Sequence, residues 1–245
     1  MALTLLGLVG TLLFAGFIAL GAWQIYRLGW KHDLIARVNQ RVHDTAVEAP
    51  GPDRWPSITA ASDEYRHVRI TGTLHNDQQA RVRASTELGS GSWVLTPLTT
   101  ANGQTVLINR GFVTSDWCGV KGGCAAGPTG EVTITGLLRI SEPHGAMLQK
   151  NDPAQDRWVS RDVQAIAASR HLGNVAPYFI DAEADGHADP AKSPVGGLTV
   201  ISFPDNHLQY AITWFVLALM TLAGAWFVVR DERRVRRQAV TRTGK

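Results

Sequence analysis

Two long runs without a charged residue constrain the fold of this chain more than any other feature. One extends from Leu3 to Tyr26 and the other from Leu208 to Val229. Each run exceeds the roughly 20 residues that an α-helix needs to cross the hydrocarbon core of a bilayer. The residues between the two runs have an ordinary mixed composition. The sequence therefore predicts two transmembrane helices that flank one domain outside the bilayer.

The basic C-terminus predicts how these helices are oriented. The second run is followed by RDERRVRRQAVTRTGK, and short basic flanks of a span stay in the cytoplasm. Two spans then place both termini inside and the central domain outside. Arg27 and Lys31 follow the first span on the outer side and oppose this orientation, but long translocated domains largely ignore the charge rule. The predicted segments are a transmembrane helix at 1–27, an outer β-rich domain at 28–206, a transmembrane helix at 207–230 and a basic tail at 231–245.

A secretory signal peptide is the alternative for the first run. Such a peptide has a basic start, a short apolar core and a cleavage site of small residues. No Lys or Arg precedes the run, which is also too long, whereas Ala19 and Gly21 resemble a cleavage site. A retained membrane anchor is favoured, and the signal peptide stays open as the alternative.

Two cysteines, Cys118 and Cys124, lie in the glycine-rich stretch DWCGVKGGCAAG. Outside the cytoplasm, a close pair of this kind is expected to form a disulfide. The spacing differs from that of haem attachment or of a zinc knuckle. Copper(I) ligation by the two thiolates stays open as a second interpretation, because soft sulfur ligands select that ion.

The central domain is predicted to be rich in short strands. Alternating apolar residues and turn signals predict strands at YRHVRITGTL, QARVRAST, SWVLTPLTT, QTVLINRGFVT, EVTITGLLRI, APYFIDAE and, as a further candidate, GGLTVISF. One helix is predicted from Asp162 to Leu172. Ser160 or Arg161 is expected to mark its start, and Gly173 is expected to end it. The expected fold is a membrane α+β protein, in which N- and C-terminal transmembrane helices flank a small antiparallel β-barrel-like domain with one or two helices.

Motifs of enzymes and of nucleic-acid-binding proteins are not found. The sequence lacks G-x-S-x-G, a P-loop and H-E-x-x-H, and its acidic residues are scattered over turns. The net charge of +3 is modest, and much of the excess lies in the basic tail. We therefore expect neither an enzyme nor a nucleic-acid partner, and we assign the basic tail to the surface of the lipid bilayer.

Polar and aromatic residues gather where the two apolar runs meet the outer membrane level. On the second helix, His207, Tyr210 and Trp214 share one face, and on the first helix Trp23 and Arg27 lie along one side. A neutral imidazole is a common axial ligand of haem iron, aromatic rings can pack on a porphyrin, and an arginine can pair with its propionates. Close approach of the helices is expected at the small residues Gly16, Ala19, Ala22, Ala211 and Ala218.

The same residues also have an interpretation without a ligand. Trp and Tyr are enriched at membrane interfaces as anchors alone. Asn206 can cap the second helix, with His207 in its first turn. From these residues alone, haem ligation by His207 and simple marking of the membrane boundary both stay open.

Taken together, the ordered motifs resemble the Surfeit locus protein 1 family. The matching stretches run through nearly the whole chain: LGAWQIYRLGWK, EYRHVRITGTL, WVLTPL, VLINRGFV, VTITGLLRISE, PYFIDA and NHLQYAITWF. Each stretch is weak by itself, but their order, their spacing and the two flanking apolar runs are specific. The loop with Cys118 and Cys124 is not part of the family pattern.

The resemblance implies a biogenesis factor for a haem–copper terminal oxidase. It implies a two-span protein of the bacterial inner membrane with a periplasmic domain and a cytoplasmic C-terminus. The client would be oxidase subunit I, haem a would be bound transiently and delivered to it, and haem a synthase or haem o synthase would be a further partner. The position that matches the family's haem-binding histidine is His207, with Trp23 as the next candidate for a pocket wall. The alternative is a scaffold that stabilises nascent subunit I without binding haem.

Overall fold

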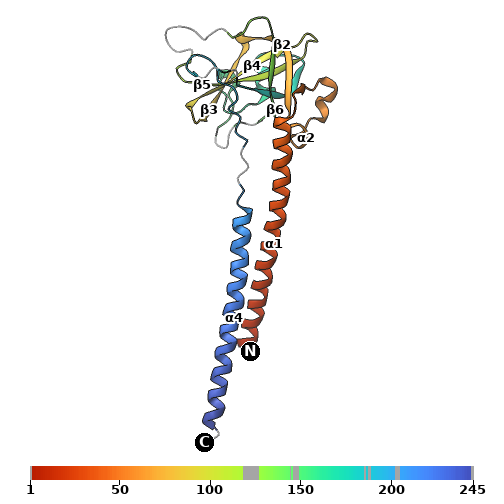
Figure 1. Ribbon diagram of the computed structural model, residues 1–245. Coiled ribbons are helices and arrows are strands. Elements are labelled where there is room, and N and C mark those ends of the chain that lie inside the picture. Colours follow the sequence, from red (N-terminus) through yellow and green to blue (C-terminus); the bar gives the residue numbers. More distant parts are fainter. Residues whose placement is uncertain are drawn as a thin grey trace. The chain divides into compact units, whose positions relative to one another are not determined.

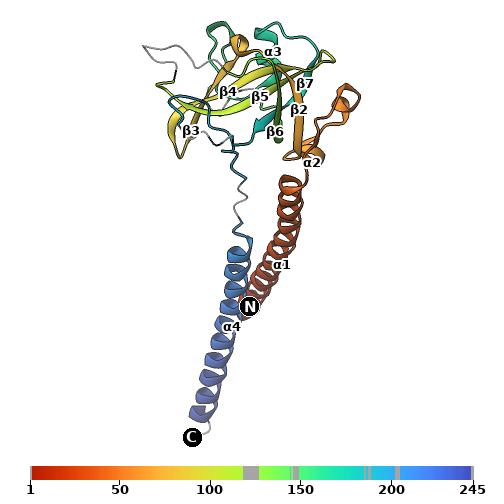
Figure 2. The same ribbon diagram turned by 45° about the horizontal axis from the view of Figure 1, so that its top comes forward.

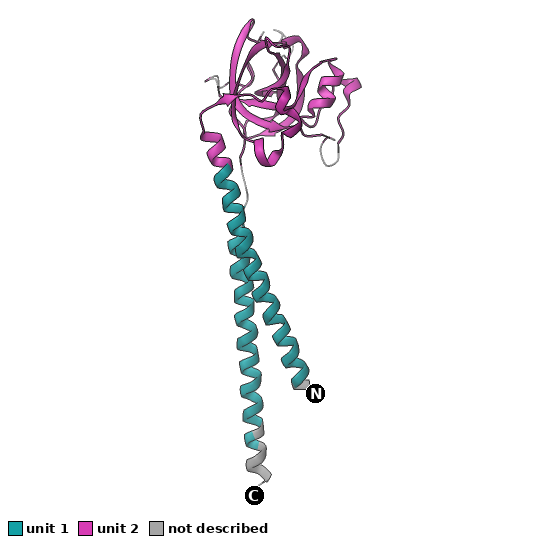
Figure 3. Cartoon of the chain, turned by 90° about the vertical axis from the view of Figure 1, so that its right-hand side faces the viewer, with its two compact units in different colours: residues 1–37, 202–245 teal, residues 38–201 magenta. Residues whose placement is uncertain are grey.

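The computed structural model describes residues 2–117, 127–143, 145, 149–184, 186, 189–201 and 205–243, apart from the side chains of 2, 3, 236 and 239–243. Cys118 and Cys124 lie outside the described residues, so their disulfide stays a prediction. The chain forms two compact units, residues 1–37 with 202–245 and residues 38–201 (Figure 3). Each unit is described by itself below.

Two long helices make up the first unit. They are α1 (Ala2–His43), whose last turns belong to the second unit, and α4 (His207–Thr243). Both are long and apolar enough to cross a membrane, as the sequence predicts. The helices lie side by side and antiparallel in each view (Figure 1). Large side chains such as Leu12 and Leu219 remain 64% exposed along them, as expected for helices whose outer faces contact lipid rather than water.

The two helices contact each other through residues at heptad spacing. The least exposed positions of α4 in this unit include His207, Ala211, Trp214, Ala218 and Thr221, and those of α1 include Phe14, Phe17, Gly21, Gln24 and Leu28. Alternating steps of three and four residues keep one side of each helix facing its partner.

Small residues allow α1 and α4 to approach each other closely. Only some of the small residues predicted from the sequence lie at this contact. Ala211 and Ala218 are buried, as predicted, whereas Ala19 and Ala22 are exposed and a Cβ atom on Gly16 would meet nothing within 4 Å. The close contact on α1 is made by Gly21, where an added Cβ would lie 2.6 Å from the Phe215 ring. The predictions for Gly16, Ala19 and Ala22 are therefore wrong, because these residues do not lie on the side of α1 that faces α4.

The second unit is a strongly curved sheet with short helices. Its strands are β1 (Val47–Glu48), β2 (His67–Leu74), β3 (Ala80–Thr86), β4 (Gly89–Thr99), β5 (Thr105–Thr114), β6 (Glu131–Ile140) and β7 (Val175–Ala182). Its helices are α2 (Ala60–Asp63), α3 (Val163–Ser169) and the 3-10 turns η1 (Pro52–Ser57), η2 (Asn76–Gln78) and η3 (Pro153–Gln155). The order is β1-β2-β6-β7-β5-β4-β3, and an additional β2–β4 pairing closes the strands into a barrel (Figure 2).

The barrel is mostly antiparallel, as predicted, with two parallel pairings. β1 runs parallel to β2, and β5 runs parallel to β7. The second pairing arises because β7 inserts between β5 and β6 instead of adding to the end of a meander. β4 bends at a register shift between Trp93 and Leu95, which lets it pair with β3, β5 and β2 along its length.

Alternation along the strands builds a core on each face of the sheet. Tyr178 and Ile180 of β7 point into the barrel with Val68, Leu98 and other aliphatic residues. Phe179 points to the opposite face, where it packs with Ile166 of α3. The Tyr178 hydroxyl donates to the Pro50 carbonyl at 2.7 Å, and burial raises its pKa. The period of two thus places one apolar layer inside the barrel and a second beneath α3.

Two predicted elements differ from the structure. The helix begins at Val163 because Asp162, rather than Ser160 or Arg161, is its N-cap and accepts from the Ala165 amide at 3.1 Å. It ends at Ser169, before the predicted stop at Gly173, because His171 adopts a left-handed backbone with φ 53°.

The prediction of a strand at GGLTVISF is also wrong for the residues of this stretch that the structure describes. Residues 196–201 form no strand, and pairing stops at the bridge between Val195 and Phe112. Gly197, at φ +73°, turns the chain out of an extended conformation, and Val200 is 79% exposed.

Candidate functional site

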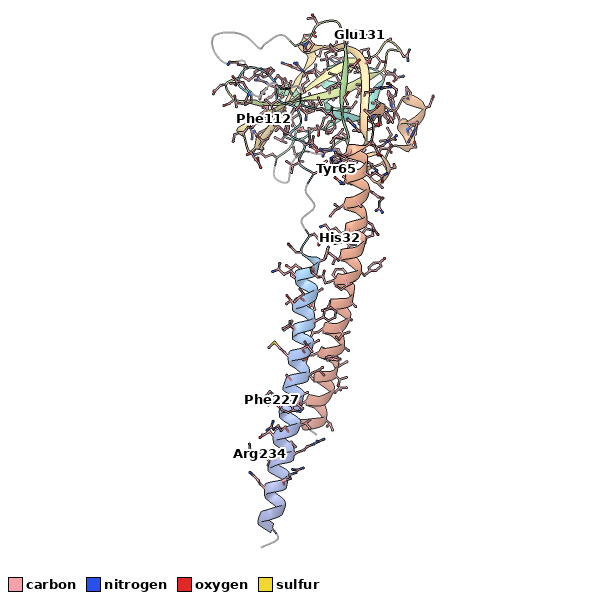
Figure 4. The ribbon with its side chains drawn as sticks, in the orientation of Figure 1. His32, Tyr65, Phe112, Glu131, Phe227 and Arg234 are labelled. Atoms are coloured by element: carbon pink, nitrogen blue, oxygen red, sulfur yellow. The ribbon has the colours of Figure 1, made fainter. Side chains whose placement is uncertain are left out.

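His207 is the first residue of α4, and the acid before it holds it in place. The His207 amide donates to Asp205 Oδ1 at 3.1 Å, while Asp205 Oδ2 lies 3.2 Å from His32 Nε2. Figure 4 labels His32 on α1. Asn206 contributes its backbone carbonyl to the first turn, accepting from the Tyr210 amide at 3.1 Å. The side chain that caps the helix is therefore that of Asp205, which also ties the start of α4 to the neighbouring helix.

Gln24 orients the His207 ring. Its Oε1 lies 2.7 Å from His207 Nδ1, and the Gln24 residue is only 9% exposed. A carbonyl oxygen accepts, so Nδ1 carries the proton and donates it to this bond. When the imidazole is neutral, this tautomer has its lone pair on Nε2, and no described residue forms a hydrogen bond with that atom. Metal-binding histidines commonly have one ring nitrogen held by a hydrogen bond in this way, and the other nitrogen is then the one that can ligate.

Of the other predicted site residues, Trp214 lies between α1 and α4, whereas Trp23 and Tyr210 lie on the outer surface of the hairpin. The Trp214 ring stacks on Phe17 at a centroid distance of 5.8 Å. Trp23 and Tyr210 are 53% and 55% exposed. The Arg27 guanidinium lies 4.6 Å from the centre of the Trp30 ring on the same helix.

The structure therefore brings His207 together with Gln24 rather than with the indole of Trp23. Gln24 and Trp23 are neighbours in sequence, so their side chains project about 100° apart around the helix. The exposed rings of Trp23 and Tyr210 stay available to a flat ligand outside the seam. Gln24, Phe17 and Asp205 are the residues that sequence reasoning missed. The heptad spacing of Phe17, Gly21 and Gln24 is the signal that identifies the first two.

A second polar cluster lies in the barrel domain. Asp181 on β7 accepts from Asn109 Nδ2 at 2.7 Å, from Arg139 at 2.9 Å and from Thr199 Oγ1 at 2.9 Å. Arg161 completes the set at 3.4 Å. These residues line a cavity of about 430 Å³. Asp181 is thus satisfied by four donors, which is the arrangement of a structural anchor.

This cluster does not have the side chains of a metal centre, since Asp181 is its one acidic member. Within the described ranges, no group of three or more His, Cys, Asp or Glu side chains could hold a metal ion. Arg110, at the end of the VLINRG stretch, donates to Asn76 Oδ1 at 3.0 Å. Gly111 adopts φ +126°, and a Cβ there would lie 2.2 Å from the Val195 carbonyl. The Arg110–Gly111 pair therefore serves the packing of the domain.

Comparison with known proteins decides the family. The model of the SURF1 family matches residues 11–219, which covers α1 from residue 11 onward, the whole barrel and α4 as far as residue 219. The chain belongs to the SURF1 family. The resemblance that the sequence motifs indicated is confirmed.

Three relatives illustrate how far this SURF1 family chain resembles characterised members. Surfeit locus protein 1 of Mus musculus is 30% identical over 224 residues, covering 85% of this chain and 70% of the relative. The Homo sapiens protein of the same name is 31% identical over 225 residues, covering 85% and 72%. A SURF1-like protein of Monosiga brevicollis is 33% identical over 223 residues, covering 86% and 82%. The similarity thus extends over most of each chain rather than over one motif.

Proposed function

We propose that this chain is a membrane-anchored assembly factor for a haem–copper terminal oxidase, which binds haem a through His207 and aids its insertion into subunit I. The observation that carries the proposal is the hydrogen bond between Gln24 and His207, because it leaves Nε2 with a free lone pair. Membership of the SURF1 family supports the assembly role, since the resemblance of the sequence implies it.

A single imidazole suits a carrier that has to release its cargo. A haem held through the imidazole of His207 alone would be released more readily than one held through two protein side chains. The exposed rings of Trp23 and Tyr210 offer apolar faces to a porphyrin, and Arg27 offers a guanidinium to its propionates. Imidazole, aromatic rings and a guanidinium are the side chains that would hold a haem here.

The proposed location is the bacterial inner membrane, with the barrel domain in the periplasm and the C-terminus in the cytoplasm. Support comes from the end of α4, where Arg230, Arg233, Arg234 and Arg237 surround one hollow beyond the apolar run. Basic residues that closely follow a span favour the cytoplasmic side. The lipid bilayer, oxidase subunit I, and haem a synthase or haem o synthase are the proposed partners, and we propose no catalytic activity of the chain itself.

Complementation of a strain that lacks this gene tests the proposal. We expect the wild-type chain to restore oxidase activity and His207→Ala to lower it at least about tenfold, since losing even an outer partner of a metal ligand often costs that much. Leu208→Ala is the matched control, because Leu208 is the next residue of α4 and is 54% exposed. Equal amounts of each variant in the membrane, measured by immunoblot, ensure that loss of the protein does not mimic loss of function.

Full oxidase activity with His207→Ala would contradict haem delivery through this residue. If subunit I still co-purifies with that variant, the scaffold that stabilises subunit I without haem becomes the better account. Loss of activity with Leu208→Ala as well would show that the start of α4, rather than the imidazole, is what the oxidase requires.

A further inference from the structure

An apolar groove lies further along the hairpin than His207, on the side of the chain termini. It has a volume of about 680 Å³ and lies between α1 and α4. Phe14, Phe17 and Leu217 are among the residues that line it, and glycines at 10 and 224 keep it open, since a Cβ on either would meet nothing within 4 Å. The Thr221 hydroxyl in its wall donates to the Leu217 carbonyl of its own helix at 2.8 Å. The groove therefore presents a hydrocarbon surface.

One polar atom in the contact between α1 and α4 has no hydrogen-bond partner among the described residues. Trp214 Nε1 is buried without a hydrogen-bond acceptor in the described part of the chain. The Trp214 ring stacks on Phe17, which also forms a wall of the groove. A buried indole N–H normally finds an acceptor, because leaving it unpaired in an apolar setting is unfavourable. This atom therefore indicates a ligand that carries an oxygen acceptor next to a long apolar part.

The spacing along α4 matches such a ligand. His207 and Trp214 occupy the same side of the helix, and seven residues at 1.5 Å each separate them by about 10 Å. Leu217, at the groove, lies about 5 Å further along. A ring bound at His207 would thus place a substituent on its edge near Trp214, and a chain attached to that substituent would continue into the groove.

We propose that the groove holds the isoprenoid tail of the haem, and that Trp214 Nε1 donates a hydrogen bond to the hydroxyl group where this tail joins the porphyrin. The inference rests on the proposed haem-binding function. Haem a and haem o both carry a hydroxyethylfarnesyl group at this position, whereas haem b carries a vinyl group. The hairpin then selects farnesylated haems, because haem b can satisfy neither the indole nor the groove.

Titration of the purified full-length protein with haem o and haem b, followed by the Soret band, tests this selectivity. We expect haem o to bind at least about tenfold more tightly, which corresponds to about 1.4 kcal/mol. Gly10→Leu fills the groove and should reduce this ratio toward one. Trp214→Phe keeps the stacked ring but removes the N–H, and it should also reduce the ratio. Farnesol should compete with haem o and not with haem b.

Gly16→Leu is the matched control, because Gly16 lies on the same helix, has open space around it and does not line the groove. It should leave the ratio unchanged. Equal affinity of the wild type for both haems would overturn the tail site while leaving the proposed function intact, whereas binding of neither haem would overturn both. If native mass spectrometry finds a phospholipid that Gly10→Leu displaces, while haem o and haem b bind equally, the groove is a lipid site instead.

Discussion

Replacing Asp181 by alanine should destabilise the barrel domain by about 3–5 kcal/mol, the usual effect of removing one partner from a buried ionic cluster. Asp181 is 4% exposed and accepts from Arg139, Asn109 and other donors. Burial by itself would lower the pKa of Arg139, but the charge of Asp181 and of other nearby anions raises it instead. The substitution would leave the guanidinium groups of Arg139 and Arg161 beside a cavity without the carboxylate between them.

Thermal unfolding of the full-length protein in detergent, followed by near-ultraviolet circular dichroism, measures this effect. The barrel domain carries Trp93, Trp117 and Trp158, so its loss of packing changes the aromatic signal. Glu131→Ala, at the exposed start of β6, is the control and should stay within about 0.5 kcal/mol of the wild type. Equal stability of the two variants would contradict the role of Asp181 as the anchor of the cluster.

Replacing Gln24 by leucine should weaken haem binding by about ten- to a hundredfold, the range typical of losing a residue that orients a metal ligand. Leucine keeps a similar volume in the helix seam but cannot accept the Nδ1 proton of His207. The imidazole then loses both its fixed orientation and its preference for the tautomer with a bare Nε2. Titration with haem in detergent, read from the Soret band, gives the change in affinity.

Gln209→Leu is the matched control for this variant. It makes the same substitution on an exposed position of α4, close to His207 in sequence, and should leave haem affinity unchanged. A Gln24→Leu protein that binds haem as tightly as the wild type would show that the His207 ring needs no partner on α1. Equal losses in both variants would point to a general effect of removing polar groups from the hairpin.

Much of the architecture follows from patterns that are local in the sequence. The two uncharged runs indicate α1 and α4. Alternating residues indicate β2, β3 and β6, whereas short apolar runs next to turn signals indicate β4, β5 and β7. The end of α3 could not be predicted, because it depends on the left-handed conformation of His171. The lack of strand structure at 196–201 could not be predicted either, because it depends on the conformation of Gly197. Neighbouring contacts impose both conformations. The parallel pairing of β5 with β7 likewise depends on where β7 inserts, and its own residues do not encode this.

The sequence identifies His207 of the candidate site but not its partner on α1. His207 stands out because a histidine directly precedes an apolar run. Its partner does not stand out, because Trp23 and Gln24 are adjacent and only the rotation of α1 about its axis decides which of them faces α4. The unpaired indole of Trp214 is likewise a property of packing, since the same residue in the sequence resembles an interfacial anchor.

The absorption spectrum of the haem-loaded protein, compared between wild type and His207→Met, tests the ligation of iron most directly. Exchanging an imidazole for a thioether alters the field at the iron, so we predict that the Soret and visible bands shift while haem is still bound. Identical spectra from the two proteins would mean that the haem is held by another residue, and the proposed role of His207 would be wrong.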